Sequence, residues 1–349
     1  MQKLKIIKSI VVLAIALEFT GANACSRFTY TAPDHTVVTG RSMDWVEDIK
    51  TDLWAFPAGI KKNGRAGANS IEWTSKYGSV VASGYNIGAA DGINTEGLNV
   101  NLLYLAGADY GTQIGRKKDL SILLWVQYVL DNYATVKEAA AALAKDELRI
   151  IAPTLPSGDP AALHMAISDP SGDNAILEYV GGKLVVYHGA QYRVMTNEPT
   201  YDKQLALNEY WKNLDGAFMP GTSTPEDRFV RASYYLQTAP VNTDVQKSVA
   251  TVFSIIREVS VPFGKAAPGR PNVAPTIWRT VADLKNKVYY FEATDRPNVF
   301  WVDITKLDLR VGAMVKKLPL ANNEIYADEV SEKFVQAAPF TSPEVLPGN

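Results

Sequence analysis

One residue near the start of the chain could combine a nucleophile with its own base. Cys25 is the only cysteine among the 349 residues, and it directly follows Ala22-Asn23-Ala24. If the chain is cut after Ala24, Cys25 carries a thiol and a free α-amine on the same backbone unit. An α-amine has an ordinary pKa of about 7.7–8.0, so it can accept a thiol proton near neutral pH. This pattern predicts covalent catalysis by an N-terminal cysteine.

The residues before Cys25 have the order of a secretory signal peptide. Three lysines lie among the first eight residues, an apolar run occupies 10–17, and Ala22 and Ala24 form an A-x-A cleavage site. We therefore expect residues 1–24 to be removed. The mature chain, 25–349, would then be periplasmic or secreted.

Lipidation of Cys25 is the alternative outcome of export. That route requires Leu three residues before the cysteine, where this chain has Ala22. An acylated amine could not act as a base, and the chain would be a lipid-anchored binding protein without turnover. The run at 10–17 is too short to cross a bilayer, and no later stretch is long and apolar enough, so no membrane span is expected.

The composition argues against several other classes of protein. Hydrophobic residues make up 47% of the chain and the formal net charge is −2, without any Lys/Arg-rich run, so we expect no binding of nucleic acid. The three histidines, His35, His164 and His188, do not pair at ligand spacing, so we expect no metal. His164 and His188 are interpreted as satisfied strand residues. The α-amine of Cys25 is then the natural base.

A predicted hairpin brings two charged side chains towards Cys25. Strands at 25–30 and 36–39 flank a Pro-Asp turn, and Arg41 and Asp44 would lie just past the far strand. A guanidinium beside the thiol would lower its pKa from about 8.5. Asp44 could hold the amine by a charge-assisted hydrogen bond. A surface Arg–Asp pair, worth at most about 1 kcal/mol, is the alternative.

The remaining elements alternate between strands and helices, which favours an α+β architecture of antiparallel sheets faced by helices in a single domain. The tail after Lys316 is expected to wrap the surface. The other predictions are strands at 79–87 and 98–105 around a turn at 91–97, helices at 119–133 and 135–148, strands between 164 and 196, helices that start at Thr224 and Thr243, a loop at 262–275, and strands between 276 and 302.

Five features in order resemble the choloylglycine hydrolase and penicillin V acylase family of N-terminal nucleophile hydrolases. Cys25 is the first, and the others cover the rest of the mature chain: Gly40-Arg41-Ser42-Met43-Asp44, Asp91-Gly92-Ile93-Asn94-Thr95-Glu96-Gly97-Leu98, Thr196-Asn197-Glu198-Pro199 and Thr224–Arg231. Asp227 replaces the usual Ser of the last motif. The resemblance implies a four-layer αββα sandwich, a homotetramer and no cofactor.

The resemblance also implies the roles of individual residues. Cys25 would attack an amide carbonyl, and the tetrahedral oxyanion would be met by the Asn197 side-chain amide and the Tyr104 backbone N–H. The six implied catalytic residues are Cys25, Arg41, Asp44, Tyr104, Asn197 and Arg228.

The expected substrate is a small-molecule amide with an apolar acyl group. The short stretch between Asn197 and Arg228, and residues 261–281, are similar to the exported Gram-negative penicillin V acylases. Members of that branch take phenoxyacetyl amides and, in several cases, N-acyl homoserine lactones. Hydrolysis of conjugated bile salts is the alternative. Five aromatic residues could line an acyl pocket or be plain core: Trp45, Trp54, Phe56, Trp73 and Tyr85.

Overall fold

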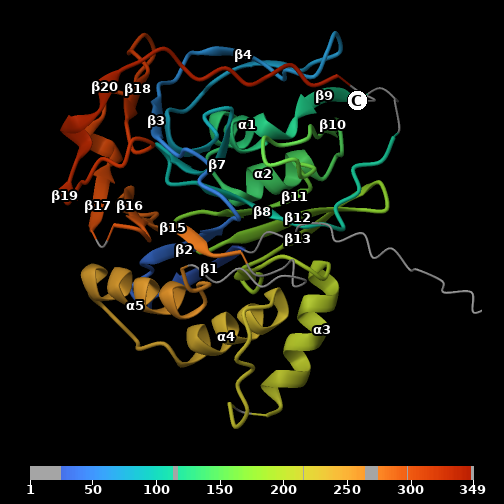
Figure 1. The fold of residues 1–349 in the computed structure, drawn as a ribbon, viewed down its shortest axis with the longest axis vertical. Coiled ribbons are helices and arrows are strands. Elements are labelled where there is room, and N and C mark those ends of the chain that lie inside the picture. The colour runs from blue at the N-terminus through green and yellow to red at the C-terminus, as the bar shows by residue number, and fades with distance from the viewer. Residues whose placement is uncertain (1–24, 113–116, 215, 264–273, 297, 347–349) are drawn as a thin grey trace, which may run out of the picture.

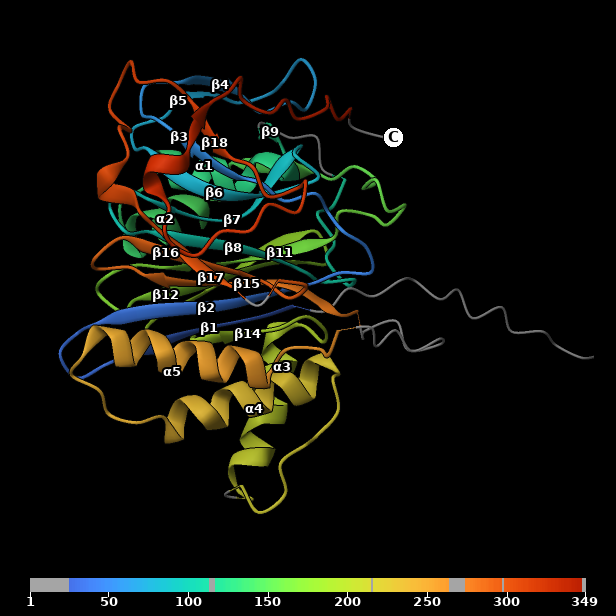
Figure 2. The same cartoon turned by 60° about the vertical axis from the view of Figure 1, so that its left-hand side comes forward.

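The chain folds into four layers, helix–sheet–sheet–helix, which Figure 2 shows from the side. The computed structural model describes residues 25–112, 117–214, 216–263, 274–296 and 298–346. The predicted α+β sandwich is therefore confirmed. The predicted signal peptide, 1–24, and most of the predicted loop at 262–275 lie outside the described residues.

The seven-stranded sheet carries Cys25 on its second strand, next to the edge. Its strand order is β14-β1-β2-β15-β16-β17-β19, antiparallel except for the last pair. These strands are β1 (Cys25–Thr31), β2 (Val37–Asp44), β14 (Val194–Met195), β15 (Thr276–Asp283), β16 (Val288–Ala293), β17 (Val299–Asp303) and β19 (Asp328–Glu329).

The nine-stranded sheet lies against it, in the order β13-β12-β11-β8-β7-β6-β3-β18-β20. Its strands are β3 (Leu53–Phe56), β6 (Ser79–Gly84), β7 (Gly88–Asn94), β8 (Asn99–Tyr104), β11 (Leu163–Ser168), β12 (Asn174–Val180), β13 (Lys183–His188), β18 (Lys316–Leu318) and β20 (Val335–Gln336). The tail after Lys316 was expected to wrap the surface. It instead also joins both sheets, because it adds β18 and β20 to the nine-stranded sheet and β19 to the seven-stranded one.

Helices cover the outer face of each sheet (Figure 1). Helices α1 (Trp125–Asn132) and α2 (Val136–Leu143) lie over the nine-stranded sheet, and α3 (Tyr201–Lys212), α4 (Pro225–Thr238) and α5 (Val245–Glu258) over the seven-stranded one. The short elements are β4 (Lys61–Asn63), β5 (Glu72–Thr74), β9 (Lys118–Ser121), β10 (Leu148–Ile151) and the 3-10 turns Ile122–Leu124, Ile304–Lys306 and Ser331–Lys333.

Several predicted boundaries were wrong because strands extend wherever they find partners. Strand β2 continues to Asp44, since β1 and β15 pair with it on both sides. Asp91–Asn94, expected in a turn, belong to β7, which pairs with β6 and β8. The expected helix at 119–133 begins only at Trp125, because residues 118–121 form β9. Helix α3 was not predicted.

Gly40 sets how closely α5 approaches the central strands. A Cβ at Gly40 would lie 2.7 Å from Cγ1 of Val252 in α5 and 3.1 Å from Cζ of Phe28 in β1. Real Cβ atoms essentially never sit at the first distance. Glycine in β2 therefore allows α5 to pack tightly behind the strand that carries Arg41.

Candidate active site

The register of the first hairpin places the candidate site at the first residue of β1, Cys25. Cys25 pairs with Met43, and Arg27 pairs with Arg41, so these side chains share the face that looks towards the nine-stranded sheet. Arg41 reaches across, and its Nη2 donates to the carbonyl oxygen of Leu102 in β8 at 3.1 Å. Because side chains alternate, Asp44 belongs to the opposite face, where the helices pack.

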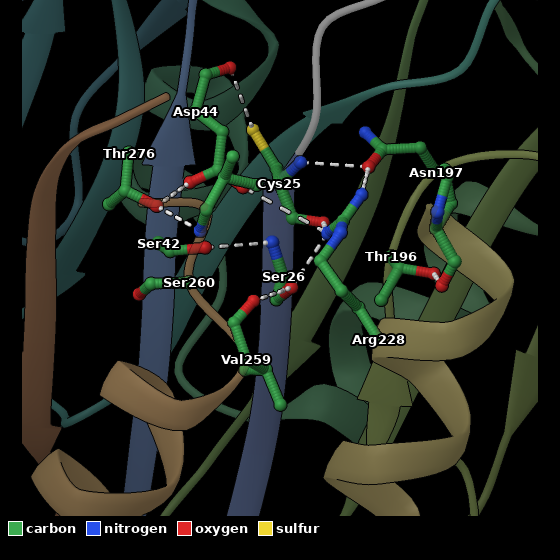
Figure 3. Close-up of polar contacts among 12 residues, drawn as sticks. Cys25, Ser26, Ser42, Asp44, Thr196, Asn197, Arg228, Val259, Ser260 and Thr276 are labelled. Atoms are coloured by element: carbon green, nitrogen blue, oxygen red, sulfur yellow. Dashed lines mark hydrogen bonds and ion pairs between the residues drawn. The ribbon is translucent and has the colours of Figure 1, made fainter. Parts of the chain in front are cut away.

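The thiol of Cys25 is buried beside a cation. Its Sγ lies 4.0 Å from Nη2 of Arg41 and 3.9 Å from Sδ of Met43. It also lies 4.0 Å from the carbonyl oxygen of Asp44, a contact that Figure 3 shows. Burial raises the pKa of the Cys25 thiol, although Arg41 acts to lower it. The expected fall in the thiol pKa was therefore wrong, and the sulfur needs a base to take its proton.

Asn197 connects the Cys25 backbone to the end of β8. Its Oδ1 accepts from the Cys25 nitrogen at 2.7 Å and from Nη2 of Arg228 at 2.7 Å, as Figure 3 shows. These two donors fix which end of the amide is oxygen. Its Nδ2 therefore points the other way and donates to the carbonyl oxygen of Tyr104 at 2.7 Å.

Tyr104 faces Asn197 with its backbone groups rather than with its phenol hydroxyl. The N–H of the next residue, Leu105, donates to Ala162 beside β11. Because N–H directions alternate along a strand, the Tyr104 N–H points away from β11, as does the carbonyl that meets Asn197. Its ring packs edge-on against Trp45, with ring centroids 6.0 Å apart.

Arg228 comes from the first turn of α4 and is completely buried. Its Nη1 donates to the Cys25 carbonyl oxygen and to Oγ of Ser26, the latter at 2.7 Å. The same nitrogen lies 3.9 Å from Oδ2 of Asp44. The guanidinium therefore ties the backbone of Cys25 to both Asn197 and Asp44.

Asp44 is a buried carboxylate with one oxygen available. Its Oδ1 accepts from Oγ1 of Thr276 at 2.5 Å, whereas Oδ2 has no hydrogen-bond partner among the described residues. Burial raises the pKa of Asp44 to about 6, against the attraction of Arg228. All six predicted residues thus converge around one point, and the buried pair of Asp44 and Arg228 replaces the surface Arg–Asp pair left open earlier.

An apolar pocket has Cys25 in its lining, together with Arg41 and Met43 from the same face of the sheet. Trp45 and Tyr85 line it, as predicted. Nε1 of Trp45 donates to the Tyr85 hydroxyl at 2.9 Å, and this hydroxyl donates to Oε1 of Glu47 at 2.7 Å. The other lining side chains are mostly aliphatic, among them Ile49, Ile87, Leu102, Ile122, Leu123, Leu155 and Leu163.

The other three predicted pocket residues lie elsewhere. They do not line this pocket but pack in the hydrophobic core between the nine-stranded sheet and helices α1 and α2: Trp54, Phe56 and Trp73. Sequence reasoning also missed Ser26 and Thr276, which hold Arg228 and Asp44. Their contacts depend on strand register and on a strand more than 200 residues away, so no spacing in the sequence signals them.

The described residues contain no group of three or more His, Cys, Asp or Glu side chains that could hold a metal ion. The same part of the chain includes no helix that is long and apolar enough to cross a membrane.

The αββα sandwich, with a cysteine as the first residue of β1, has the architecture of an N-terminal nucleophile amide hydrolase. The chain belongs to the linear amide C–N hydrolases of the choloylglycine hydrolase family, which it matches over residues 25–322. It is thus an enzyme that hydrolyses linear amide bonds of small molecules.

Individual relatives agree with this family. A penicillin V acylase from Pectobacterium atrosepticum is 42% identical over 94% of each chain. The solved penicillin V acylase from Agrobacterium tumefaciens has a TM-score of 0.87 and 47% identity, covering 92% of this chain and all of that one. A conjugated bile acid hydrolase from Clostridium perfringens shares the fold, with a TM-score of 0.73 and 21% identity over 87% of this chain and 98% of that one.

Proposed function

We propose that Cys25, freed by cleavage after Ala24, hydrolyses amides that carry an apolar acyl group. The main support for this proposal is the apolar pocket that Cys25 lines. The sulfur attacks the amide carbonyl, the C–N bond breaks, and the acyl group stays on sulfur as a thioester. Water then attacks the thioester and releases the acid and the free thiol.

The α-amine of Cys25 serves as the general base. The raised pKa of the Cys25 thiol supports the need for a base, because a buried thiol remains protonated until a base accepts its proton. The amine takes that proton and later passes it to the leaving amine. The 2.7 Å contact between the Cys25 nitrogen and Oδ1 of Asn197 supports a fixed position for this base. Asp44 would orient it through its unpartnered oxygen.

Nδ2 of Asn197 and the Tyr104 N–H stabilise the oxyanion. In support, two donors hold Oδ1 of Asn197 and so turn Nδ2 towards Tyr104. Losing one such donor lowers kcat by about 100–1,000-fold in comparable enzymes. Arg41 and Arg228 supply positive potential. Support for the role of Arg41 is its Nη2, which lies 4.0 Å from Sγ and places the charge beside the sulfur.

The proposed substrates are penicillin V, a phenoxyacetyl amide, and N-acyl homoserine lactones. Support comes from the aliphatic and aromatic lining of the pocket and from the 42% and 47% identity to two penicillin V acylases. A panel of penicillin V, acyl homoserine lactones of several chain lengths and glycocholate tests this choice. Turnover of glycocholate alone would instead assign a bile salt hydrolase.

Export, processing and assembly are part of the same proposal. Residues 1–24 would be removed as a signal peptide, the mature enzyme would be periplasmic or secreted, and it would form a homotetramer. Intact mass identifies the first residue and any lipid on Cys25. Cell fractionation and light scattering measure the location and the oligomeric state.

The first prediction concerns the nucleophile. Cys25→Ala removes the only thiol, so amide hydrolysis should fall to background while the thermal unfolding midpoint stays close to that of the wild type. Cys25→Ser, which keeps a weaker nucleophile, is the matched comparison. Substantial hydrolysis by folded Cys25→Ala would disprove the mechanism.

A further inference from the structure

A buried histidine and a buried glutamate lie directly behind the Asn197 loop. His164 of β11 and Glu178 of β12 are 1% and 0% exposed. Nδ1 of His164 lies 2.8 Å from Oε1 of Glu178. Its Nε2 lies 2.9 Å from the carbonyl oxygen of Thr196, the residue before Asn197. Neither side chain lines the pocket at Cys25.

The partners of His164 place one proton on Nε2 and require a second proton between Nδ1 and Glu178. A carbonyl oxygen can only accept, so Nε2 of His164 carries a hydrogen and donates to Thr196. One further proton lies between Nδ1 and Glu178, whichever group holds it. Two arrangements satisfy this count, an imidazolium with a carboxylate or a neutral imidazole with a carboxylic acid. Both keep the hydrogen bond to Thr196.

Glu178 extends this link to the far side of the loop. Its Oε2 accepts from the backbone N–H of Tyr201, the first residue of α3, at 2.8 Å. From α3, Nε2 of Gln204 donates to Oγ1 of Thr196 at 3.0 Å and to the Glu198 carbonyl oxygen at 2.7 Å. The segment 196–200 is therefore held at both ends, and Asn197 lies within it.

We propose that His164 and Glu178 are positioning residues that set the catalytic geometry of Asn197. This inference rests on the proposed role of Asn197 as an oxyanion donor. The pair does not touch the reacting atoms. It acts on kcat by holding the Thr196 carbonyl, and with it the direction of the Asn197 amide. A misplacement of about 1 Å in such a group can cost about 100-fold in rate.

Two variants with the same amide group, but different reach, provide the test. His164→Gln can still place a nitrogen donor at the Thr196 carbonyl, whereas His164→Asn is one methylene shorter and cannot. We expect His164→Asn to lower kcat by at least about tenfold with KM nearly unchanged, and His164→Gln to recover most of kcat. Glu178→Gln should behave like His164→Gln, because its amide can donate to a neutral His164 and still accept from Tyr201.

A double-mutant cycle shows whether His164 acts through Asn197. If it does, His164→Asn combined with Asn197→Ala loses no more activity than Asn197→Ala alone, because the positioned group is already absent. His188→Asn is the matched control, since His188 also pairs with a carboxylate, Asp173, at 2.7 Å, but is exposed. This control should keep wild-type kcat.

The outcomes separate the two proposals. Full activity in Asn197→Ala would overturn the proposed oxyanion donor. Low activity in Asn197→Ala, together with wild-type kcat in folded His164→Asn or additive losses in the double mutant, would overturn only the positioning role. Thermal unfolding midpoints well above the assay temperature ensure that the comparison is between folded proteins.

Discussion

At the residue scale, the site is built from charges that burial makes unfavourable. The carboxylate of Asp44 is completely buried, and its pKa rises to about 6 from an ordinary value of 3.8. The folded chain therefore binds a proton at a pH where the unfolded chain has already lost it. Thr276 and Arg228 favour the ionised form of Asp44, but its burial still costs stability once the carboxyl loses its proton.

The stability of the chain should reveal this carboxylate. A raised acid pKa gives a stabilising contribution that is present at low pH and lost as the pH rises through about 6. In a chain that still carries Ala24, the Cys25 nitrogen is an amide and does not compensate the charge. The difference in free energy of unfolding between wild type and Asp44→Asn should then fall by about 2 kcal/mol from about pH 4.5 to 7.5. Urea titrations across that range measure it.

An exposed carboxylate serves as the control for this measurement. Asp308 pairs with Arg310 at the surface, which lowers the pKa of Asp308 to about 2. Its contribution has the opposite sign and is lost only below its ordinary pKa, so Asp308→Asn should show a flat difference over the same pH range. A flat difference for Asp44→Asn as well would contradict a raised pKa at Asp44.

At the element scale, β2 is the strand on which the site depends. It carries Arg41 and Asp44 on opposite faces, and it is hydrogen-bonded to β1 on one side and β15 on the other. Its outer face receives α5 at Gly40. The approach of α5 thus fixes how β2 lies against the end of β1, where Cys25 begins.

Filling the space at Gly40 should disturb this packing. Gly40→Ala places a Cβ 2.7 Å from Cγ1 of Val252, and overpacking of this kind costs about 1–3 kcal/mol of stability. Val252→Ala removes the clashing methyl groups, so the double variant should lose less than the two single losses added together. Denaturant unfolding of all four proteins gives this coupling energy.

Gly107→Ala is the matched control, because nothing lies within 4 Å of a Cβ there. Its stability should stay near that of the wild type. Additive losses at Gly40 and Val252 would mean that α5 does not approach β2 as closely as the structure shows.

Elements with local signals were predictable from the sequence. Thr135 caps α2 by accepting from the N–H of Glu138, and α4 begins with Pro225, both as predicted. Helix α3 was missed because Gln204 and Asn208 lie on its buried face, so no apolar period is visible. The convergence of the site residues followed from family motifs, whereas the lowering of the thiol pKa was mispredicted because the sequence does not show how deeply Cys25 is buried.

At the scale of the whole molecule, the four layers bring distant parts of the chain to one point. The site combines the first residue of β1, the last half of β2, the last residue of β8, the loop after β14 and the first turn of α4, so its parts span more than 200 residues. Both sheets and one helix layer must be assembled before Asn197 and Arg228 reach Cys25. On the proposed mechanism, what remains after folding is a local covalent change, the release of the Cys25 amine by cleavage after Ala24.

If the α-amine is the base, one extra residue before Cys25 should make a correctly folded enzyme much slower. A chain that begins at Ala24 keeps the buried thiol and its pocket, but the Cys25 nitrogen is an amide and cannot accept a proton. Since a positioned general base contributes about 100–10,000-fold, the chain that begins at Ala24 should be slower than one that begins at Cys25 by a factor in that range. Both chains should unfold cooperatively, which shows that each is folded, and each should carry one thiol that iodoacetamide alkylates after denaturation. Intact mass before and after the assay must show that Ala24 is still present, and comparable rates for the two chains would rule out the α-amine as the base.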